Sequence, residues 1–488
     1  MTNGTDKRKS LTIGMATFDD YDGVYFTVQA IRLFHPEITE ETEILVVDNH
    51  PDGPCATELK ALESWVAGYR YIPFNRIQGT SVRDVIFREA NADAVLSIDC
   101  HVMFAPGALR QLIDYFEANP DSRDLLQGPL VYDDLRSFST HMTPTWSTGM
   151  YGVWGTDTRA ADSDAPPFEI ALQGLGAFAC RKVAWTGFNP RLRGFGGEEG
   201  YIQEKFRRAG GRTLCMPFLR WIHRFGRPMG VPYQNTWEDR IHNYMIIADE
   251  LGYDPTPALD HFRNHIGREP AERIINQVRA ELNNPFHFFD AIYCINLAQQ
   301  TARWQEVTSR FQQLGIASRV RRFEAIPTQH NHHIGCGLSH RAIIAEAKSL
   351  GLKNVLVFED DVRFTSDALT GLRQSINELR GREWNLLYLG ACRWHREVLP
   401  LPGCQRLGLA GPVTCAHAVA YHHSIFDRIL NDMPNENAMM ERWLQTHHGI
   451  DQYYAFTLTE NKFLLSPVIA TQTSILPMES AEVQRMLV

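Results

Sequence analysis

Short apolar runs alternate with amphipathic stretches along the first 250 residues. The runs at 11–17 (LTIGMAT), 43–49 (EILVVDN) and 94–102 (AVLSIDCHV) are rich in Val, Ile and Leu and have the length of strands. The stretches at 23–34 and 79–92 repeat apolar residues with the period of a helix. Near-continuous apolar strands that alternate with helices are typical of a parallel sheet covered on both faces. This half of the chain is therefore predicted to be an α/β domain.

The alternation stops near residue 250 and begins again near residue 289. The segment between these points is charged and contains Pro255, Pro257 and Pro270, which indicates a helical connector. The runs FDAIYCINL and NVLVFEDDV then flank a helical stretch at 301–315. The predicted fold class is thus α/β, with two domains in tandem. The predicted boundaries are a flexible N-terminus at 1–10, a first domain at 11–250, a helical linker at 251–286 and a second domain at 287–488.

Polar residues end the apolar runs of the first half. Asp48 and Asn49 end one run, and Asp99 and His101 end another. Ligands of open α/β sheets bind beyond the carboxyl ends of the strands. If the strand continues through residue 101, Asp99 and His101 point to the same side and share one cation, and Mn²⁺ suits this ligand pair. The alternative is a polar strand end that binds nothing.

A glycine-rich segment, GFGGEEGYIQEKFRRAGG at 194–211, leads into a helix that begins with Glu198 and Glu199. Carboxylates are stabilised at a helix N-terminus, so these two serve either a ligand or only the cap. His223 follows in an aromatic and basic segment and either completes a metal shell or is an ordinary buried histidine. Arg224 or Arg227 is expected to contact phosphate.

The apolar run VLVFEDDV of the second half ends in three acids. Unpaired buried carboxylates are costly, so a bound cation or sugar explains them better than a core strand does. Strand alternation predicts that Glu359 and Asp361 share one face while Asp360 points away; the alternative is a solvated acidic turn. Upstream, HNHHIGCGLSH at 330–340 is rich in His and Cys, but its spacing fits no structural zinc site. A glycine-rich turn leading into a helix is the preferred interpretation.

Composition narrows the class of protein. The chain has 488 residues, 44% of them hydrophobic, and a net charge of −9, which argues against a general binder of nucleic acid or anionic membranes. No apolar run reaches the roughly 18 residues of a membrane-spanning helix, and no apolar segment follows the polar N-terminus as in a signal peptide. The nine cysteines lack metal-type or framework spacing, which is typical of reduced thiols. The predicted location is the cytoplasm.

The first half resembles the GT-A glycosyltransferases of family 2. The run from VVDN through IDCH to RGFGGEEGYIQEKFRRAGG and the later IHR are similar, in particular, to the polypeptide N-acetylgalactosaminyltransferases. The resemblance implies a metal site of Asp99, His101 and His223. It implies a donor pocket of Thr17, Asp48, Arg83 and Glu198, with Asp48 at the base and Arg83 near the diphosphate. Glu199 would deprotonate the acceptor if the enzyme inverts configuration; the polypeptide branch retains it.

The second half resembles glycosyltransferase family 25, the lipooligosaccharide and procollagen galactosyltransferases. The motifs are YCINLAQQTARW, IGCGLSH, VLVFEDDV, CAHAVAYHHS, IDQYYA and TQTSIL, in this order. The resemblance implies donor contacts from Asn296 and Arg303, and metal binding by Glu359 and the catalytic Asp361. It implies that Asp451 is a base or acceptor contact. The histidines before Gly335 depart from the family pattern.

Together these resemblances predict a bifunctional, metal-dependent hexosyltransferase that adds two sugars in sequence to one acceptor. The expected cofactors are Mn²⁺ or Mg²⁺ and a nucleotide-sugar donor, with a UDP-sugar favoured. The acceptor is a saccharide, a lipid-linked glycan such as lipooligosaccharide, or a peptide; nucleic acid is disfavoured by charge. Two alternatives are one active domain with a degenerate acceptor-binding partner, and a non-enzymatic sugar-binding scaffold.

Overall fold

The structure is a computed structural model that describes residues 9–75, 79–226, 230, 234–328, 330–393 and 399–472. By internal contacts the chain divides into two units, Met1–Val278 and Arg279–Val488. The helices predicted for the linker, α7 (Thr256–Ile266) and most of α8 (Arg268–Leu282), thus group with the first unit.

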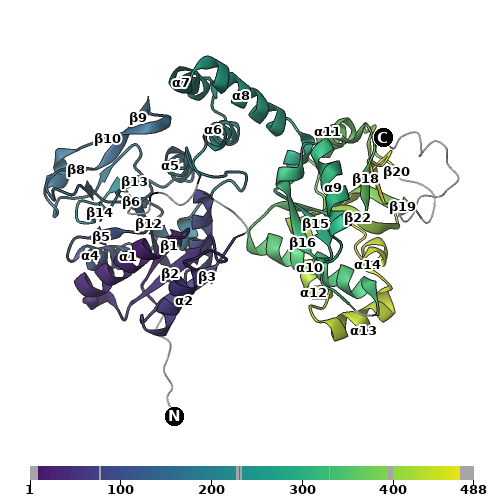
Figure 1. The fold of residues 1–488 in the computed structure, drawn as a ribbon, viewed down its shortest axis with the longest axis horizontal. Coiled ribbons are helices and arrows are strands. Elements are labelled where there is room, and N and C mark those ends of the chain that lie inside the picture. Colours follow the sequence, from purple (N-terminus) through teal and green to yellow (C-terminus); the bar gives the residue numbers. More distant parts are fainter. Residues whose placement is uncertain are drawn as a thin grey trace, which may run out of the picture. The chain divides into compact units, whose positions relative to one another are not determined.

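An eight-stranded sheet forms the centre of the first unit (Figure 1). Its strands, in spatial order, are β11 (Phe168–Glu169), β13 (Thr213–Cys215), β6 (Leu125–Gln127), β12 (Ala177–Arg181), β4 (Ala94–Ile98), β1 (Leu11–Thr17), β2 (Thr42–Asp48) and β3 (Tyr69–Pro73). The remaining strands form two small sheets, β5 (Val102–Phe104), β14 (Trp221–His223), β7 (Leu130–Val131) and β8 (Phe138–Ser139), and β9 (His141–Ser147) with β10 (Met150–Gly155). The other helices are α1 (Tyr21–Phe34), α2 (Ala56–Ala61), α3 (Arg83–Glu89), α4 (Ala108–Ala118), α5 (Glu198–Arg208) and α6 (Trp237–Leu251).

The second unit has its own eight-stranded sheet (Figure 1). The spatial order is β16 (Val320–Glu324), β15 (Ala291–Asn296), β17 (Asn354–Glu359), β22 (Val413–His422), β19 (Leu386–Arg393), β23 (Lys462–Leu465), β21 (Leu407–Leu409) and β20 (Leu399–Pro400). A short pair, β18 (Val362–Phe364) and β24 (Ala470–Gln472), lies outside this sheet. The helices are α9 (Thr301–Gln313), α10 (His332–Ser349), α11 (Ala368–Leu379), α12 (His423–Asp432), α13 (Asn437–His447) and α14 (Ile450–Phe456).

Side-chain alternation along the second sheet produces two separate cores. On one face Val355 and Val357 of β17 pack with residues of α10, α12, α13 and α14, and on the other Leu356 and Phe358 pack with α9 and α11. Successive side chains of a strand point to opposite faces, so a continuous apolar run requires helices on both. The predicted α/β fold with covered sheets is confirmed for both halves.

The sheets are mixed, whereas the sequence predicted parallel ones. β3, β2, β1 and β4 run parallel, but β12 pairs antiparallel with β4. Likewise β16, β15 and β17 are parallel, and β22 is antiparallel to β17. Buried strands of either direction are apolar throughout, so composition alone does not reveal the direction of the added strands.

Both units reverse strand order beside their first strand. After β1 the chain adds β2 and β3 on one side and then β4 on the other, and after β15 it adds β16 on one side and β17 on the other. Such a reversal leaves a crevice at the carboxyl ends of the two central strands, where α/β proteins bind ligands. The fold therefore predicts one site per unit, after β1 and β4 and after β15 and β17.

Candidate functional site

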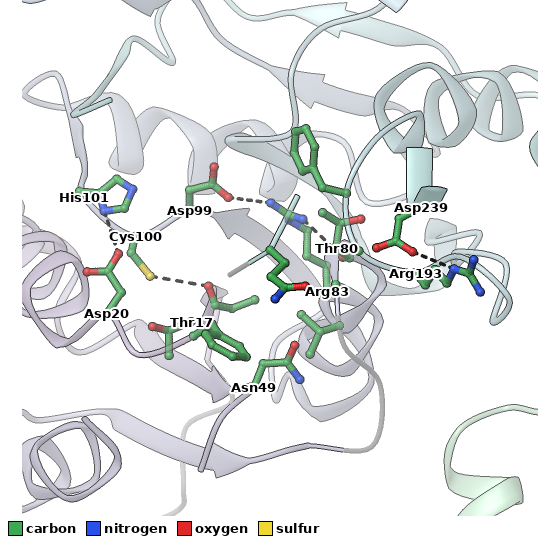
Figure 2. Close-up of a pocket in the computed structure, with 17 residues that line it drawn as sticks. Thr17, Asp20, Asn49, Thr80, Arg83, Asp99, Cys100, His101, Arg193 and Asp239 are labelled. Carbon is green, nitrogen blue, oxygen red and sulfur yellow. Dashed lines mark hydrogen bonds and ion pairs between the residues drawn. The ribbon is translucent and has the colours of Figure 1, made fainter. Parts of the chain in front are cut away.

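A cavity of about 530 Å³ lies at the predicted place in the first unit. Thr17 at the end of β1, Asn49 after β2 and the segment Asp99–His101 after β4 all line it (Figure 2). The hydroxyl oxygen of Thr17 is buried and has no hydrogen-bond partner in the described part of the chain. The three strand ends thus bring polar groups from distant parts of the sequence to one crevice.

Asp99 is held between a cation and an imidazole. Arg83 donates from Nη2 to Asp99 Oδ1 at 2.6 Å, and His223 Nε2 lies 3.6 Å from Asp99 Oδ2. Burial raises the pKa of Asp99, but the charge of Arg83 and the bond to His223 outweigh burial and hold the pKa well below its usual value. Asp99 is therefore ionised at neutral pH, with Oδ2 directed toward His223.

His101 reaches this site from a turn and not from a strand. β4 ends at Ile98, and His101 has a left-handed φ of 57° before β5 begins. The predicted i, i+2 alternation through residue 101 is therefore wrong; a tight turn brings the side chains together instead. The His101 ring lies edge-on to the His223 ring, with 4.9 Å between centroids, and its Nδ1 is 3.3 Å from Asp20 Oδ2. A β-carbon on Gly23 would lie 2.5 Å from His101 Nδ1, so glycine is needed for this approach.

The types of these residues suit a divalent cation, although Asp99, His101 and His223 do not form a group whose ligand atoms all lie within 4.8 Å of one another. Asp99 keeps one oxygen for Arg83 and offers the other beside two imidazoles, and carboxylate oxygen with imidazole nitrogen is a suitable ligand set for Mn²⁺. Arg83 also lines the cavity and supplies a fixed positive charge next to the same carboxylate.

Glu198 and Glu199 are buried in the first turn of α5. Glu198 Oε2 accepts a hydrogen bond from the Gly196 N–H at 2.7 Å, as in a cap. Burial, and next the charge of Glu198, raise the pKa of Glu199 to about 8. Neither glutamate is among the described residues that line the cavity, although both lie close enough to Arg83 to affect its charge balance.

Asp48 is buried beside the cavity and not in its lining. Its Oδ2 accepts a hydrogen bond from the Tyr71 hydroxyl at 2.7 Å, and its Oδ1 accepts one from the His50 N–H at 2.9 Å. The next residue, Asn49, lines the cavity and donates from Nδ2 to the Phe74 carbonyl at 3.0 Å. The hydrogen bonds of Asp48 thus fix the loop that follows β2, and Asn49 is the residue of this loop that faces the cavity.

The second unit contains a cavity of about 580 Å³ at the equivalent place. Asn296, the last residue of β15, donates from Nδ2 to Asp360 Oδ2 at 2.6 Å, and Arg303 donates to Asp360 Oδ1 at 3.3 Å. All three residues line the cavity. The predicted donor residues Asn296 and Arg303 are therefore brought together by Asp360, which the sequence analysis directed away from the site.

β17 ends at Glu359, so strand alternation does not extend to the next two acids. Residues 360 and 361 form a turn before β18. Glu359 and Asp360 line the cavity, whereas Asp361, with a buried Oδ1, is not among its described lining residues. The predicted pairing of Glu359 with Asp361 on one face of a strand is wrong for this reason.

The glycine-rich segment before these acids is helical from His332 onward, so the predicted turn before a helix is wrong. A β-carbon on Gly335 would lie 2.3 Å from the Ile326 carbonyl oxygen, which shows that glycine serves close packing here. Cys336 and His340 occupy the same face of this helix and approach Glu359, at 3.7 Å (Sγ to Oε1) and 3.8 Å (Nε2 to Oε1). Their four-residue spacing on a helix was the signal that the sequence analysis missed.

Asp451 lines the second cavity from the first turn of α14. Its Oδ2 accepts a hydrogen bond from the Cys415 N–H at 2.9 Å, and its Oδ1 accepts one from the Gln452 N–H at 2.8 Å. Three carboxylates therefore line the cavity, Glu359 at the end of β17, Asp360 in the turn that follows and Asp451 on α14. Arg227 and the end of TQTSIL, residues 473–476, lie outside the described residues.

The first unit has further cavity residues, Arg193, Asp239 and Asp20, to which the sequence motifs assigned no role. Arg193 donates from Nε to Asp239 Oδ1 at 2.8 Å across the cavity wall, and Asp20 contacts His101 (Figure 2).

Among the described helices, none is both long and apolar enough to cross a membrane.

Each half of the chain contains a segment that matches a glycosyltransferase family model. Residues 12–168 match the model of glycosyl transferase family 2, and residues 268–400 match that of glycosyltransferase family 25 (LPS biosynthesis protein). The predicted tandem architecture is thereby confirmed. The matched segments include Thr17, Asp48, Arg83, Asp99 and His101 in the first half and Asn296, Arg303, Glu359 and Asp361 in the second.

Individual relatives are distant. The mouse protein named inactive glycosyltransferase 25 family member 3 is 24% identical over 291 residues, which cover 51% of this chain and 46% of the relative. A Drosophila melanogaster glycosyltransferase 25 family member is 25% identical over 181 residues, 32% of this chain and 27% of the relative. The chain thus spans less than half the length of these relatives. A crystal structure of GalNAc-T7 with UDP, GalNAc and Mn²⁺ has 14% identity and a TM-score of 0.40, over 50% of this chain and 48% of that one.

Proposed function

Because the chain joins a glycosyltransferase family 2 region to a family 25 region, we propose that it is a bifunctional, metal-dependent glycosyltransferase. The observation that supports this most is repeated in both units: a cavity above 500 Å³ at the strand-order reversal, lined by polar side chains at the ends of two central strands, one of which leads into acids. Each cavity is of the size that holds a small ligand or cofactor.

The first unit would bind a nucleotide-sugar, preferably a UDP-sugar, in its cavity. Asp99, His101 and His223 would hold Mn²⁺ or Mg²⁺, which when bound neutralises the departing diphosphate. Arg83 lies in the same wall, next to Asp99, and would add a positive charge near the diphosphate. Thr17, Asp48 and Glu198 would position the nucleoside side, Asp48 through the loop that carries Asn49.

Glu199 would act as the base on an inverting path. A base must be ionised to accept the acceptor's proton, and the pKa of about 8 places half-ionisation just above neutrality. On a retaining path Glu199 would only shape the site. The pH dependence of transfer separates the two paths.

The second unit would bind its donor through Asn296 and Arg303, which share Asp360. Glu359 and Asp361 are the proposed ligands of its divalent ion, and Asp451 is the proposed base, because its carboxylate lines the same cavity. The acceptor class is a saccharide, a lipid-linked glycan or a peptide. A tether between two transferases raises the concentration of one product near the other site, commonly to about the millimolar range.

Donor hydrolysis by the purified full chain tests the proposal. A panel of uridine and guanosine diphosphate sugars is assayed with Mn²⁺ and with chelator, for the wild type, Asp99→Ala and Asp361→Ala. Exposed acids supply matched controls, Asp164→Ala in the first unit and Asp427→Ala in the second. Two metal-dependent activities, each lost in a different variant and neither in a control, are expected. Loss of both activities in either variant would refute independent sites.

A second candidate function keeps one active unit, with the other as a degenerate module that binds the acceptor. It is favoured by the name of the mouse relative, which describes an inactive member of family 25. In that case metal-dependent turnover survives in Asp361→Ala and is abolished in Asp99→Ala. Absence of any donor turnover would instead favour a sugar-binding scaffold.

A further inference from the structure

Three metal-type ligands in the second unit have no role in the proposed transfer reaction as a set. Cys336 and His340 of α10 and Glu359 of β17 place one ligand atom each within 4.8 Å of one another, and no other such group of His, Cys, Asp or Glu occurs among the described residues. We infer that this cluster binds one Zn²⁺ or similarly soft divalent ion. This ion differs from the one proposed for the donor diphosphate, and the two would share the Glu359 carboxylate, which contributes Oε1 to the cluster.

The distances fit a small tetrahedral ion. Glu359 Oε1 lies 3.7 Å from Cys336 Sγ and 3.8 Å from His340 Nε2. Zinc bonds of about 2.0 Å to nitrogen or oxygen and about 2.3 Å to sulfur place two tetrahedral ligand atoms about 3.5 Å apart. The two distances from Glu359 Oε1 are therefore within a few tenths of an ångström of this value, and Cys336 Sγ lies within 4.8 Å of His340 Nε2. Cys336 and His340 are four residues apart, so their place on one helix face follows from helix geometry.

His340 is oriented as metal-binding histidines are. The side chain is fully buried, and its Nδ1 lies 2.8 Å from the Tyr421 hydroxyl. Tyr421 donates its own proton to the Tyr454 hydroxyl at 3.2 Å, so it accepts a hydrogen bond from Nδ1–H. The lone pair of the neutral ring is then on Nε2, which faces Glu359 and has no hydrogen-bond partner in the described part of the chain. A second partner that fixes the tautomer in this way is a regular feature of metal sites.

Ligand chemistry selects the ion. A thiolate with an imidazole favours zinc over magnesium or manganese, which prefer oxygen ligands. When the ion binds, Cys336 loses its thiol proton to solvent and forms a metal–sulfur bond, so affinity increases with pH. Cys336 and Glu359 also line the cavity, so a fourth coordination position faces it. Three protein ligands with one open position are the arrangement of an exchangeable rather than a closed structural zinc site.

Cobalt is the first probe. The full chain, stripped with chelator, is titrated with Co²⁺ alone and then with Zn²⁺. One equivalent of Co²⁺ should give a near-ultraviolet thiolate-to-metal absorption that Zn²⁺ removes. Cys336→Ser should abolish this absorption, whereas Cys415→Ser, a thiol of the same cavity outside the cluster, should retain it. If no thiolate absorption appears, the inference is overturned; this would be the result if Co²⁺ bound only to His332 and His333, which line the same cavity. Persistence of the absorption in Cys336→Ser would overturn it as well.

Alkylation of the wild type gives a readout that needs no variant. With Zn²⁺ at about 100 times its dissociation constant, about one molecule in a hundred is unbound, so alkylation of Cys336 should slow about 100-fold. Peptide mass spectrometry compares Cys336 with Cys415, which should react at an unchanged rate. Equal rates at Cys336 with and without Zn²⁺ contradict the inference. Neither readout uses a nucleotide-sugar, so failure of the transferase assay leaves this result unaffected.

Discussion

Glu199→Gln removes a buried carboxyl group of the first unit whose pKa is raised into the range that a stability measurement can test. Glu199 is 7% exposed in the first turn of α5, next to the buried Glu198. Burial, followed by repulsion from Glu198, raises the pKa of Glu199 from 4.5 to about 8. Glutamine has nearly the same shape as the protonated glutamic acid and cannot ionise. The substitution therefore measures how much the ionisation of this buried side chain lowers the free energy of unfolding.

The sign and size of the effect follow from linkage. Between pH 4.5 and about 8 the unfolded chain has released the proton while the folded protein retains it. The stabilisation from the retained proton is fully present below pH 4.5 and is lost as pH increases through about 8. A difference of about 3.5 pKa units at 1.36 kcal/mol each sets an upper limit of about 5 kcal/mol. Relaxation around the ionised group reduces this limit, so about 2–5 kcal/mol is expected.

Calorimetric unfolding of the full chain at about pH 5 and about pH 9 measures this loss. Two units give separate transitions, and the one that differs in Glu199→Gln reports the first unit. Since about 1 kcal/mol shifts the midpoint by roughly 2–4 °C in units of this size, the wild-type midpoint should fall by several degrees more than that of the variant. Glu117→Gln, an exposed substitution on α4, changes net charge equally and should behave as the wild type. If the unfolding midpoints of the wild type and of Glu199→Gln fall by the same amount between about pH 5 and about pH 9, Glu199 is not buried and protonated, and the reasoning is refuted.

Other predictions concern activity and packing. If Glu199 is the base, the rate of transfer by the first unit increases with pH, with its midpoint near pH 8, and Glu199→Gln abolishes transfer. A rate that does not change with pH favours the retaining path. Arg83→Met leaves Asp99 without its ion pair and should destabilise the first unit by about 1.5–3 kcal/mol in urea unfolding, while Asp99→Asn in the same background should recover part of the loss. Gly335→Ala places a β-carbon 2.3 Å from a backbone carbonyl and should destabilise the second unit. The expected loss is about 1–3 kcal/mol, whereas Gly226→Ala, with open space around it, should have little effect.

Local patterns in the sequence were enough to predict where the central strands lie. The first strand was predicted at 11–17 and lies at Leu11–Thr17, and the helix that begins with Glu198 was placed correctly. The strand end at Asp48 was also predicted, because a buried strand must stop where charged groups begin, whereas the strand expected to reach Asp361 ends at Glu359. Periodicity and burial are local constraints, so a single sequence reveals them.

Side-chain direction after a strand end was not predictable in this way. Alternation holds only while the backbone stays extended, and at both acid motifs the chain turns within two residues of the strand end. The turn places His101 beside His223, and Asp360, not Asp361, beside Asn296. The direction of β12 and β22 was hidden for a related reason, since burial on both faces makes parallel and antiparallel strands equally apolar.

The sequence by itself determined the two α/β halves, their strand-end acids and their likeness to two glycosyltransferase families, because these depend on runs of neighbouring residues. Only the tertiary structure decided which of these residues share a cavity. Asp99 meets Arg83 and His223, and Glu359 meets His340, across separations of up to 124 residues that no local pattern encodes. Pairing and packing between elements far apart in the chain produce these contacts: β14 pairs with β5 directly after the turn at Asp99, and α10 packs against β17.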